Sequence, residues 1–107
     1  MAQTKVAAIQ MTCGADPARN LARAEELVRQ AAAQGAQIVL LPELFERPYF
    51  CQERRYDYYD YALPVGENPA VRRFSEVCRE LELVMPVSFY ERDGLRLLFT
   101  GAALYFA

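Results

Sequence analysis

The sequence has no histidine and no tryptophan, and its only lysine is Lys5. Without histidine, the chain by itself holds neither a Ser-His-Asp nor a Cys-His catalytic arrangement. The three cysteines, Cys13, Cys51 and Cys78, include no Cys-x-x-Cys pair. A zinc site built from cysteine and histidine is therefore not expected, and neither is a disulfide framework. These absences narrow the chemistry that the chain can hold alone.

Charge and hydrophobicity argue against two kinds of partner, nucleic acids and membranes. The net charge is -2, and basic residues are interspersed with acidic ones, so we expect no nucleic-acid partner. No apolar run reaches the length of a membrane span, and the first residues lack the layout of a signal peptide. We therefore expect no membrane partner and a cytoplasmic location. The length of 107 residues suits one globular domain.

A strand, a helix and a second strand are predicted first. Residues 5–11 (KVAAIQM) and 37–41 (QIVLL) are short, mostly apolar runs, typical of strands buried on both faces. Asp16 and Pro17 predict the start of a helix between them, and Gly35 predicts its end. Two strands joined by a helix are expected to be parallel neighbours with a right-handed crossover.

A second helix is predicted to begin at Asn68 and Pro69. Residues 83–90 (LVMPVSFY) and 95–106 predict two further strands, which a hairpin turn at residues 92–94 makes antiparallel. The fold class is therefore α/β, with the order β-α-β-loop-α-β-β. The apolar spacing of the second helix predicts an inner face made of Val71, Phe74, Ser75, Cys78 and Leu81.

Residues 45–61 form a long predicted loop that is rich in aromatic side chains. Long loops in compact domains tend to be functional. The simpler interpretation is that the rings only anchor the loop onto the core. The aromatic residues are Phe45, Tyr49, Phe50, Tyr56, Tyr58, Tyr59 and Tyr61.

Glu43 directly follows the second predicted strand, in the segment LLPELFERPYF. Ligands of open α/β sheets bind beyond the carboxyl ends of the strands. A partly desolvated carboxylate at such a position suits a general base. Position alone leaves a second interpretation open, in which Glu43 caps a helix or joins a surface ion pair.

Four segments of the chain match, in order and spacing, the pattern of one enzyme superfamily. They are residues 6–11, 20–36, 37–50 and 85–92. They resemble the first strand, the first helix, the catalytic-glutamate segment and the third strand of the nitrilase superfamily, the carbon–nitrogen hydrolases. Within the superfamily, residues 48–52 are most similar to the N-carbamoylputrescine amidase group.

This resemblance implies a mechanism. Members hydrolyse non-peptide carbon–nitrogen bonds with a Glu-Lys-Cys triad. The cysteine attacks the carbon, the glutamate is the general base, and the lysine stabilises the negative charge that develops. Glu43 matches the glutamate, whereas the positions of the lysine and cysteine lie beyond residue 107. We therefore expect residues 1–107 to be the N-terminal part of that domain and to be inactive alone.

The resemblance also implies an architecture and partners. The fold would be the N-terminal part of a four-layer αββα sandwich, a homo-oligomer when full length. The substrate would be a small-molecule amide or carbamoyl amine such as N-carbamoylputrescine, contacted by Tyr49 and Phe50. No metal and no organic cofactor is implied.

The resemblance has gaps. No cysteine occupies the position of the nucleophile, and Cys78 is expected in the core. Phe99 and Thr100 stand where the family usually has an Asn-Ser pair.

Two alternatives to an amidase fragment remain open. One is a non-catalytic chain that binds a homologue or has no function. The other is an unrelated α/β domain that mimics the pattern. An N-terminal part would leave one sheet face uncovered, so we expect the isolated chain to be poorly stable or to self-associate.

Overall fold

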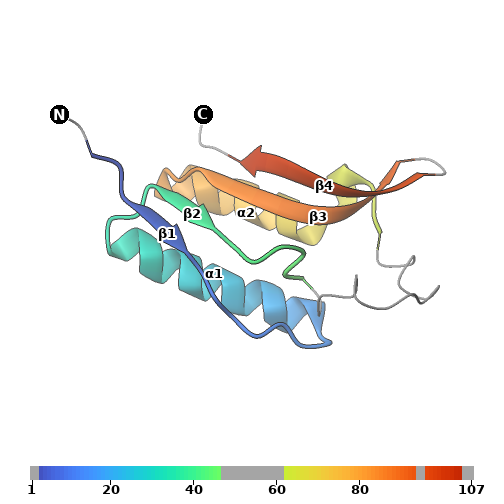
Figure 1. Cartoon of the computed structure of the whole chain (residues 1–107), viewed down its shortest axis with the longest axis horizontal. Coiled ribbons are helices and arrows are strands. Elements are labelled where there is room, and N and C mark those ends of the chain that lie inside the picture. The colour runs from blue at the N-terminus through green and yellow to red at the C-terminus, as the bar shows by residue number, and fades with distance from the viewer. Residues whose placement is uncertain (1–2, 47–61, 94–95, 105–107) are drawn as a thin grey trace.

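The computed structural model of the chain describes residues 3–46, 62–93 and 96–104 (Figure 1). It shows helices packed against strands, so the predicted α/β class is confirmed. The elements in chain order are β1 (Val6–Ala8), α1 (Pro17–Ala33), β2 (Ile38–Leu40), the 3-10 helix η3 (Val65–Glu67), α2 (Pro69–Leu81), β3 (Met85–Asp93) and β4 (Arg96–Leu104).

Both α-helices begin where the sequence predicts. The Asp16 carboxylate accepts a hydrogen bond of 3.0 Å from the amide of Ala18, and the Asn68 side chain accepts one of 3.0 Å from the amide of Val71. These bonds satisfy amides that have no partner within the first helical turn. Gly35 follows α1 with a φ of 94°, the left-handed conformation predicted for the end of this helix.

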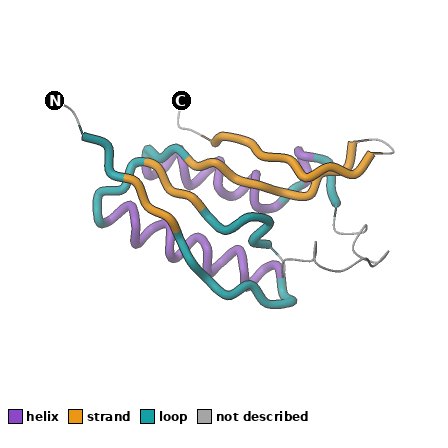
Figure 2. The backbone as a smooth tube through the Cα atoms, in the orientation of Figure 1, coloured by secondary structure: helices purple, strands orange, loops and turns teal. Residues whose placement is uncertain are grey.

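The strands lie side by side in the order β1, β2, β3, β4 (Figure 2). β1 and β2 are parallel, and β3 and β4 form an antiparallel hairpin. A short parallel bridge joins the two pairs. In it, the Val39 amide donates to the Val84 carbonyl at 3.1 Å, and the Val84 amide donates to the Gln37 carbonyl at 3.0 Å. Joined in this way, the two two-stranded sheets lie edge to edge and form one layer of four strands, with the parallel pair at the N-terminal side.

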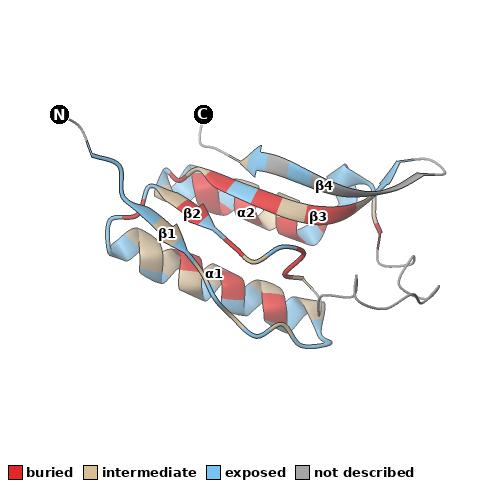
Figure 3. Ribbon diagram, viewed as in Figure 1, coloured by how far each residue is buried: buried red, intermediate tan, exposed pale blue. Residues whose placement is uncertain are grey.

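The core lies between the two helices and one face of this sheet (Figure 3). Side chains alternate between the faces of a strand. In β3, therefore, Met85, Val87 and Phe89 are buried, whereas Pro86 between them is exposed. The helices contribute Ala24, Val28, Ala70, Phe74, Val77 and Cys78 to the same cluster.

Within residues 1–107, the first two strands are not buried on both faces, contrary to the prediction. Val6 in β1 is 66% exposed and Leu40 in β2 is 50% exposed. Within the described part of the chain, β1 pairs only with β2, and both helices lie on the other face of the sheet. An apolar run alone does not distinguish an edge strand from a central one.

Phe74 and Cys78 of the predicted inner face of α2 are buried in the core, as expected. Ala70 and Val77 are buried beside them, whereas Val71, Ser75 and Leu81 are only half-buried. The inner face is therefore rotated slightly from the predicted one. None of the helices in the described ranges is long and apolar enough to cross a membrane.

Candidate active site

A tight turn at residues 43–46 follows shortly after β2 and carries Glu43. Phe45 in this turn is fully buried, and its ring meets that of Phe74 edge to face with centroids 5.8 Å apart. This contact confirms the anchoring interpretation for Phe45. The other aromatic residues of the predicted loop, including the proposed substrate contacts Tyr49 and Phe50, lie outside the described residues.

Leu44 holds the turn in an unusual backbone conformation. Its φ is 52°, in the left-handed region that costs an L-residue about 1–2 kcal/mol. Its side chain is buried, and its amide donates a hydrogen bond of 2.7 Å to the hydroxyl oxygen of Ser88 in β3. Packing and this hydrogen bond offset the strain.

Two buried asparagines hold the far end of the same turn. The Asn20 side chain in α1 donates to the carbonyl oxygens of Gly14 and Glu46, both at 2.8 Å, and accepts from the Gly14 amide at 2.9 Å. The Asn68 side chain at the start of α2 donates to the Glu46 carboxylate at 3.1 Å. Both helices therefore fix the turn, and the buried amides are satisfied.

Ser88 and Asn20 were not predicted as site residues from the sequence. Asn20 does carry a signal that could have been used. It stands at positions i, i+4 and i+8 with Ala24 and Val28, the two buried apolar residues of α1, so a polar side chain there faces the core and needs partners. Ser88 carries no comparable signal, because its partner is 44 residues away.

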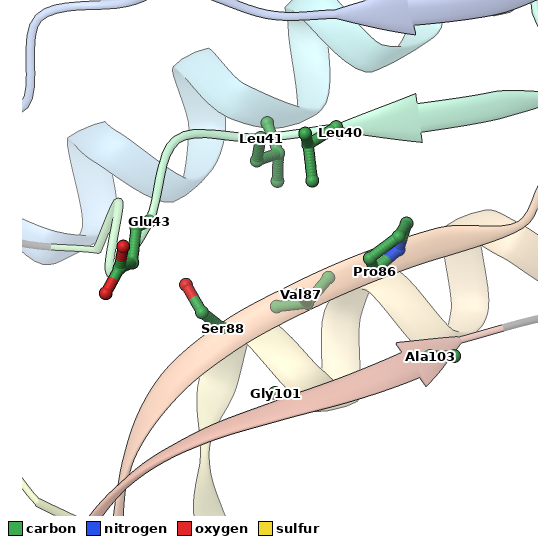
Figure 4. A pocket seen from close by; sticks show the side chains of 8 residues that line it. All are labelled: Leu40, Leu41, Glu43, Pro86, Val87, Ser88, Gly101 and Ala103. Carbon is green, nitrogen blue, oxygen red and sulfur yellow. The ribbon is translucent and has the colours of Figure 1, made fainter.

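Glu43 stands at the rim of an open hollow of about 510 Å³ on the sheet face opposite the helices (Figure 4). Ser88 lies at the same end of the hollow, with its hydroxyl directed toward the turn. Apolar and small side chains form most of the remaining wall. The lining residues are Leu40, Leu41, Glu43, Pro86, Val87, Ser88, Gly101 and Ala103.

The arrangement offers one exposed carboxylate and one hydroxyl over an apolar floor. Glu43 is exposed, so the partial desolvation expected at the strand end is not present among the described residues. Ser88 pairs across the hairpin with Gly101, which adds no side chain there. The hollow therefore has room for another group next to Glu43.

The cysteines that the structure describes lack the character of a nucleophile. Burial raises the pKa of Cys78 to about 11, and burial also raises the pKa of the half-buried Cys13. Both therefore remain thiols near neutral pH, whereas a reactive cysteine needs a lowered pKa. Cys78 is fully buried in the core, as predicted. Cys51 lies outside the described residues.

Lys5 is the only lysine in the sequence, and the structure does not place it near Glu43. Lys5 precedes β1 while Glu43 follows the parallel strand β2, so the two residues stand at opposite ends of the pair. The Lys5 ammonium instead donates to the Gln34 carbonyl at the end of α1, at 2.6 Å. Within the three described ranges, no three histidine, cysteine or acidic residues are grouped so that they could hold a metal ion.

Fold and site together define an α/β protein with an acidic residue on the turn after a parallel strand. The model of the carbon–nitrogen hydrolase family matches residues 5–106, which is nearly the whole chain. The chain belongs to this family, and the resemblance found in the sequence is confirmed. The match includes β4, where the sequence departs at Phe99 and Thr100 from the usual family pattern.

Individual relatives agree with the family assignment. The chain is 46% identical over 89 residues to an N-carbamoylputrescine amidase of Oryza sativa subsp. japonica, covering 83% of this chain and 30% of the relative. It is 40% identical over 94 residues to a citrullinase of Francisella tularensis, covering 88% and 33%. The chain thus spans about a third of the length of these relatives.

A solved structure shares the fold. Saccharomyces cerevisiae Nit3, a member of the nitrilase superfamily, superimposes with a TM-score of 0.72 at 20% sequence identity, covering 95% of this chain and 40% of Nit3. At this identity the likeness concerns the fold alone. The described elements therefore have the arrangement found in the corresponding part of a nitrilase-type protein.

Proposed function

We propose that residues 1–107 form the N-terminal part of a carbon–nitrogen hydrolase domain that acts on a carbamoylated or amidated small amine. N-carbamoylputrescine is the representative substrate. The two named relatives support this choice, because N-carbamoylputrescine and citrulline both end in a ureido group. Hydrolysis of that group consumes one water and yields the free amine, carbon dioxide and ammonia.

Glu43 is the general base of this proposal. The observation that carries it is the placement of Glu43 on a held turn at the rim of the hollow, beyond the carboxyl end of β2. Such a carboxylate can accept the proton of a cysteine thiol, so that the thiolate attacks the ureido carbon and ammonia leaves with that proton. The S-carbamoyl thioester that forms is then hydrolysed by water, which Glu43 deprotonates in turn. This releases the thiol and a carbamate that yields carbon dioxide and the free amine.

The family triad needs a lysine and a cysteine in addition to Glu43. In our proposal both come from the sequence that follows residue 107, on strands of a second sheet. That sheet completes a four-layer αββα sandwich and covers the face that carries the half-exposed Leu40. It also desolvates Glu43. Tyr49 and Phe50 contact the substrate at the mouth of the site, and the complete protein is a homo-oligomer.

The first test is to sequence the source gene beyond codon 107 and to express the complete reading frame. Ammonia release from N-carbamoylputrescine is then measured for the wild-type protein and for Glu43→Gln. The loss of a general base lowers kcat by about 10²–10⁴-fold. Glu67→Gln, the same change at an exposed residue of η3, is the matched control and leaves kcat unchanged. An unchanged rate in Glu43→Gln would remove this residue from the mechanism.

A second candidate function is a non-catalytic chain that binds a homologue. The open apolar face around Leu40 and Pro86 favours it, because such a face can dock onto another copy of the fold. A mixing experiment separates the two functions. Restored activity with a complementary C-terminal piece indicates half of an enzyme, whereas altered activity of an intact homologue indicates a modulator.

A further inference from the structure

Leu44, the residue that follows Glu43, is held in place by a hydrogen bond that its own amide donates. Leu44 is left-handed, with a φ of 52°, and a change of that angle would swing the preceding carboxylate away from the hollow. A strained backbone at a non-glycine residue persists only where its surroundings hold it, and such residues cluster at functional sites. The Ser88 hydroxyl, 2.7 Å from the Leu44 amide, is one such restraint.

The rest of the turn is already fixed by other contacts. Phe45 is buried against Phe74, and the Glu46 carbonyl accepts from Asn20 at 2.8 Å. These contacts begin on the C-terminal side of Leu44. The side of the turn that carries Glu43 is therefore tied to β3 through Ser88, whose side chain lies at the Glu43 end of the hollow (Figure 4).

We propose that Ser88 is a positioning residue, which holds the Glu43 carboxylate in place through the amide of Leu44. This inference rests on the proposed role of Glu43 as the general base. Ser88 itself transfers no proton. Its hydroxyl oxygen accepts the Leu44 amide hydrogen, and catalysis depends on the angle at which the adjacent carboxylate is presented to its proton donor.

Three variants of the complete protein test the proposal by hydrolysis of N-carbamoylputrescine. Ser88→Ala removes the acceptor and lowers kcat by about 10–100-fold, with KM within about twofold, because small displacements of a catalytic group carry penalties of this order. Ser88→Thr keeps a hydroxyl at a strand position that suits a β-branched residue, and it restores most of the rate. Ser75→Ala removes a hydroxyl that bonds to the Val71 carbonyl within α2, and it leaves kcat unchanged.

A double variant separates positioning from a general loss of structure. If Ser88 acts only through Glu43, Ser88→Ala has no further effect on kcat in the Glu43→Gln background. Equal losses in both backgrounds would show that Ser88 affects the rate by another route and would overturn the proposal. A Ser88→Ala variant with wild-type kcat would overturn it as well.

Hydrogen exchange at the Leu44 amide gives a readout that does not depend on activity. The exchange rate rises about tenfold or more in Ser88→Ala if the tether exists, because the amide loses its acceptor. An unchanged exchange rate contradicts the tether. If Glu43→Gln retains full activity while exchange at Leu44 rises, the proposed function fails and Ser88 is left with a purely structural role.

Discussion

The two faces of the sheet differ in what covers them. On the helix side, Val39, Met85 and Val87 are buried in a continuous core with both helices. On the opposite side, Leu40 is half-exposed and Pro86 is exposed, and the hollow that bears Glu43 opens there. The same strands thus build stability on one face and leave the other available for chemistry or for further chain. Substitutions on the two faces are expected to act on different properties.

The largest effect on stability is expected on the closed face. Phe74→Ala removes the ring that packs on Phe45, and such a truncation in a core costs about 3–5 kcal/mol in free energy of unfolding. Urea denaturation of the 107-residue chain followed by circular dichroism measures it. A cost below about 1 kcal/mol would contradict the packing described.

Loss of the Asn20 tether is expected to have the next largest effect. Asn20→Ala leaves the carbonyl oxygens of Gly14 and Glu46 and the Gly14 amide without their side-chain partner. Unsatisfied buried polar groups cost roughly 1–3 kcal/mol. Thermal melting measures the loss, with Gln34→Ala at the exposed end of α1 as a control. A melting temperature equal to wild type would mean that water replaces the Asn20 amide.

An acid-dependent contribution to stability is expected from the contact between the two helices. The Arg73 guanidinium, through its hydrogen bonds, together with Arg29, lowers the pKa of Glu25 from 4.5 to about 2. A carboxylate with a lowered folded-state pKa stabilises above pH 4.5, and its contribution is lost as the pH falls from 4.5 toward 2.

Glu25→Gln tests this contribution. The variant is destabilised by roughly 1 kcal/mol at pH 7, the upper end for partly exposed ion pairs. Its free energy of unfolding also falls less steeply between pH 4.5 and 2 than that of the wild type. Chemical denaturation at a series of pH values measures both. Parallel pH profiles for the two proteins would show that Glu25 does not contribute in this range.

The smallest effect on stability is expected on the open face. Leu40→Ser in the 107-residue chain changes the free energy of unfolding by no more than about 0.5 kcal/mol, because the side chain is already half-exposed. It also reduces any self-association of the chain, which analytical ultracentrifugation measures. In the complete protein the same change is expected to cost about 2 kcal/mol or more, since a second sheet would then bury this residue. Equal costs in both forms would argue against such a cover.

Local signals in the sequence predicted the helix boundaries well. Asp16, Asn68 and Gly35 act within a few residues of themselves, so capping chemistry fixes their roles without knowledge of the fold. The placement of Glu43 at the carboxyl end of a parallel strand was also predictable, because a strand-helix-strand unit has one preferred arrangement. The resemblance to the nitrilase superfamily added the proposed role of that residue.

Features that depend on distant contacts were not predictable from the sequence. The left-handed Leu44 is a hydrophobic residue at a position where glycine or asparagine is expected, and only contacts from other elements hold it. The exposure of β1 could not be predicted either, because an apolar run does not show which faces of a strand other elements cover. The position of Ser88 opposite Leu44 follows from the bridge between β2 and β3, which sequence spacing does not specify.

The tethers of the turn also set when it can form. Asn68, Asn20 and Ser88 reach it across 22, 26 and 44 residues of chain, so each bond must close a long loop before it contributes. During synthesis, β1, α1 and β2 can associate early, whereas the backbone beside Glu43 gains its last restraint only after β3 has docked. Within residues 1–107, we therefore expect the acidic residue of the proposed site to become ordered only when β3 docks, and to loosen when β3 detaches.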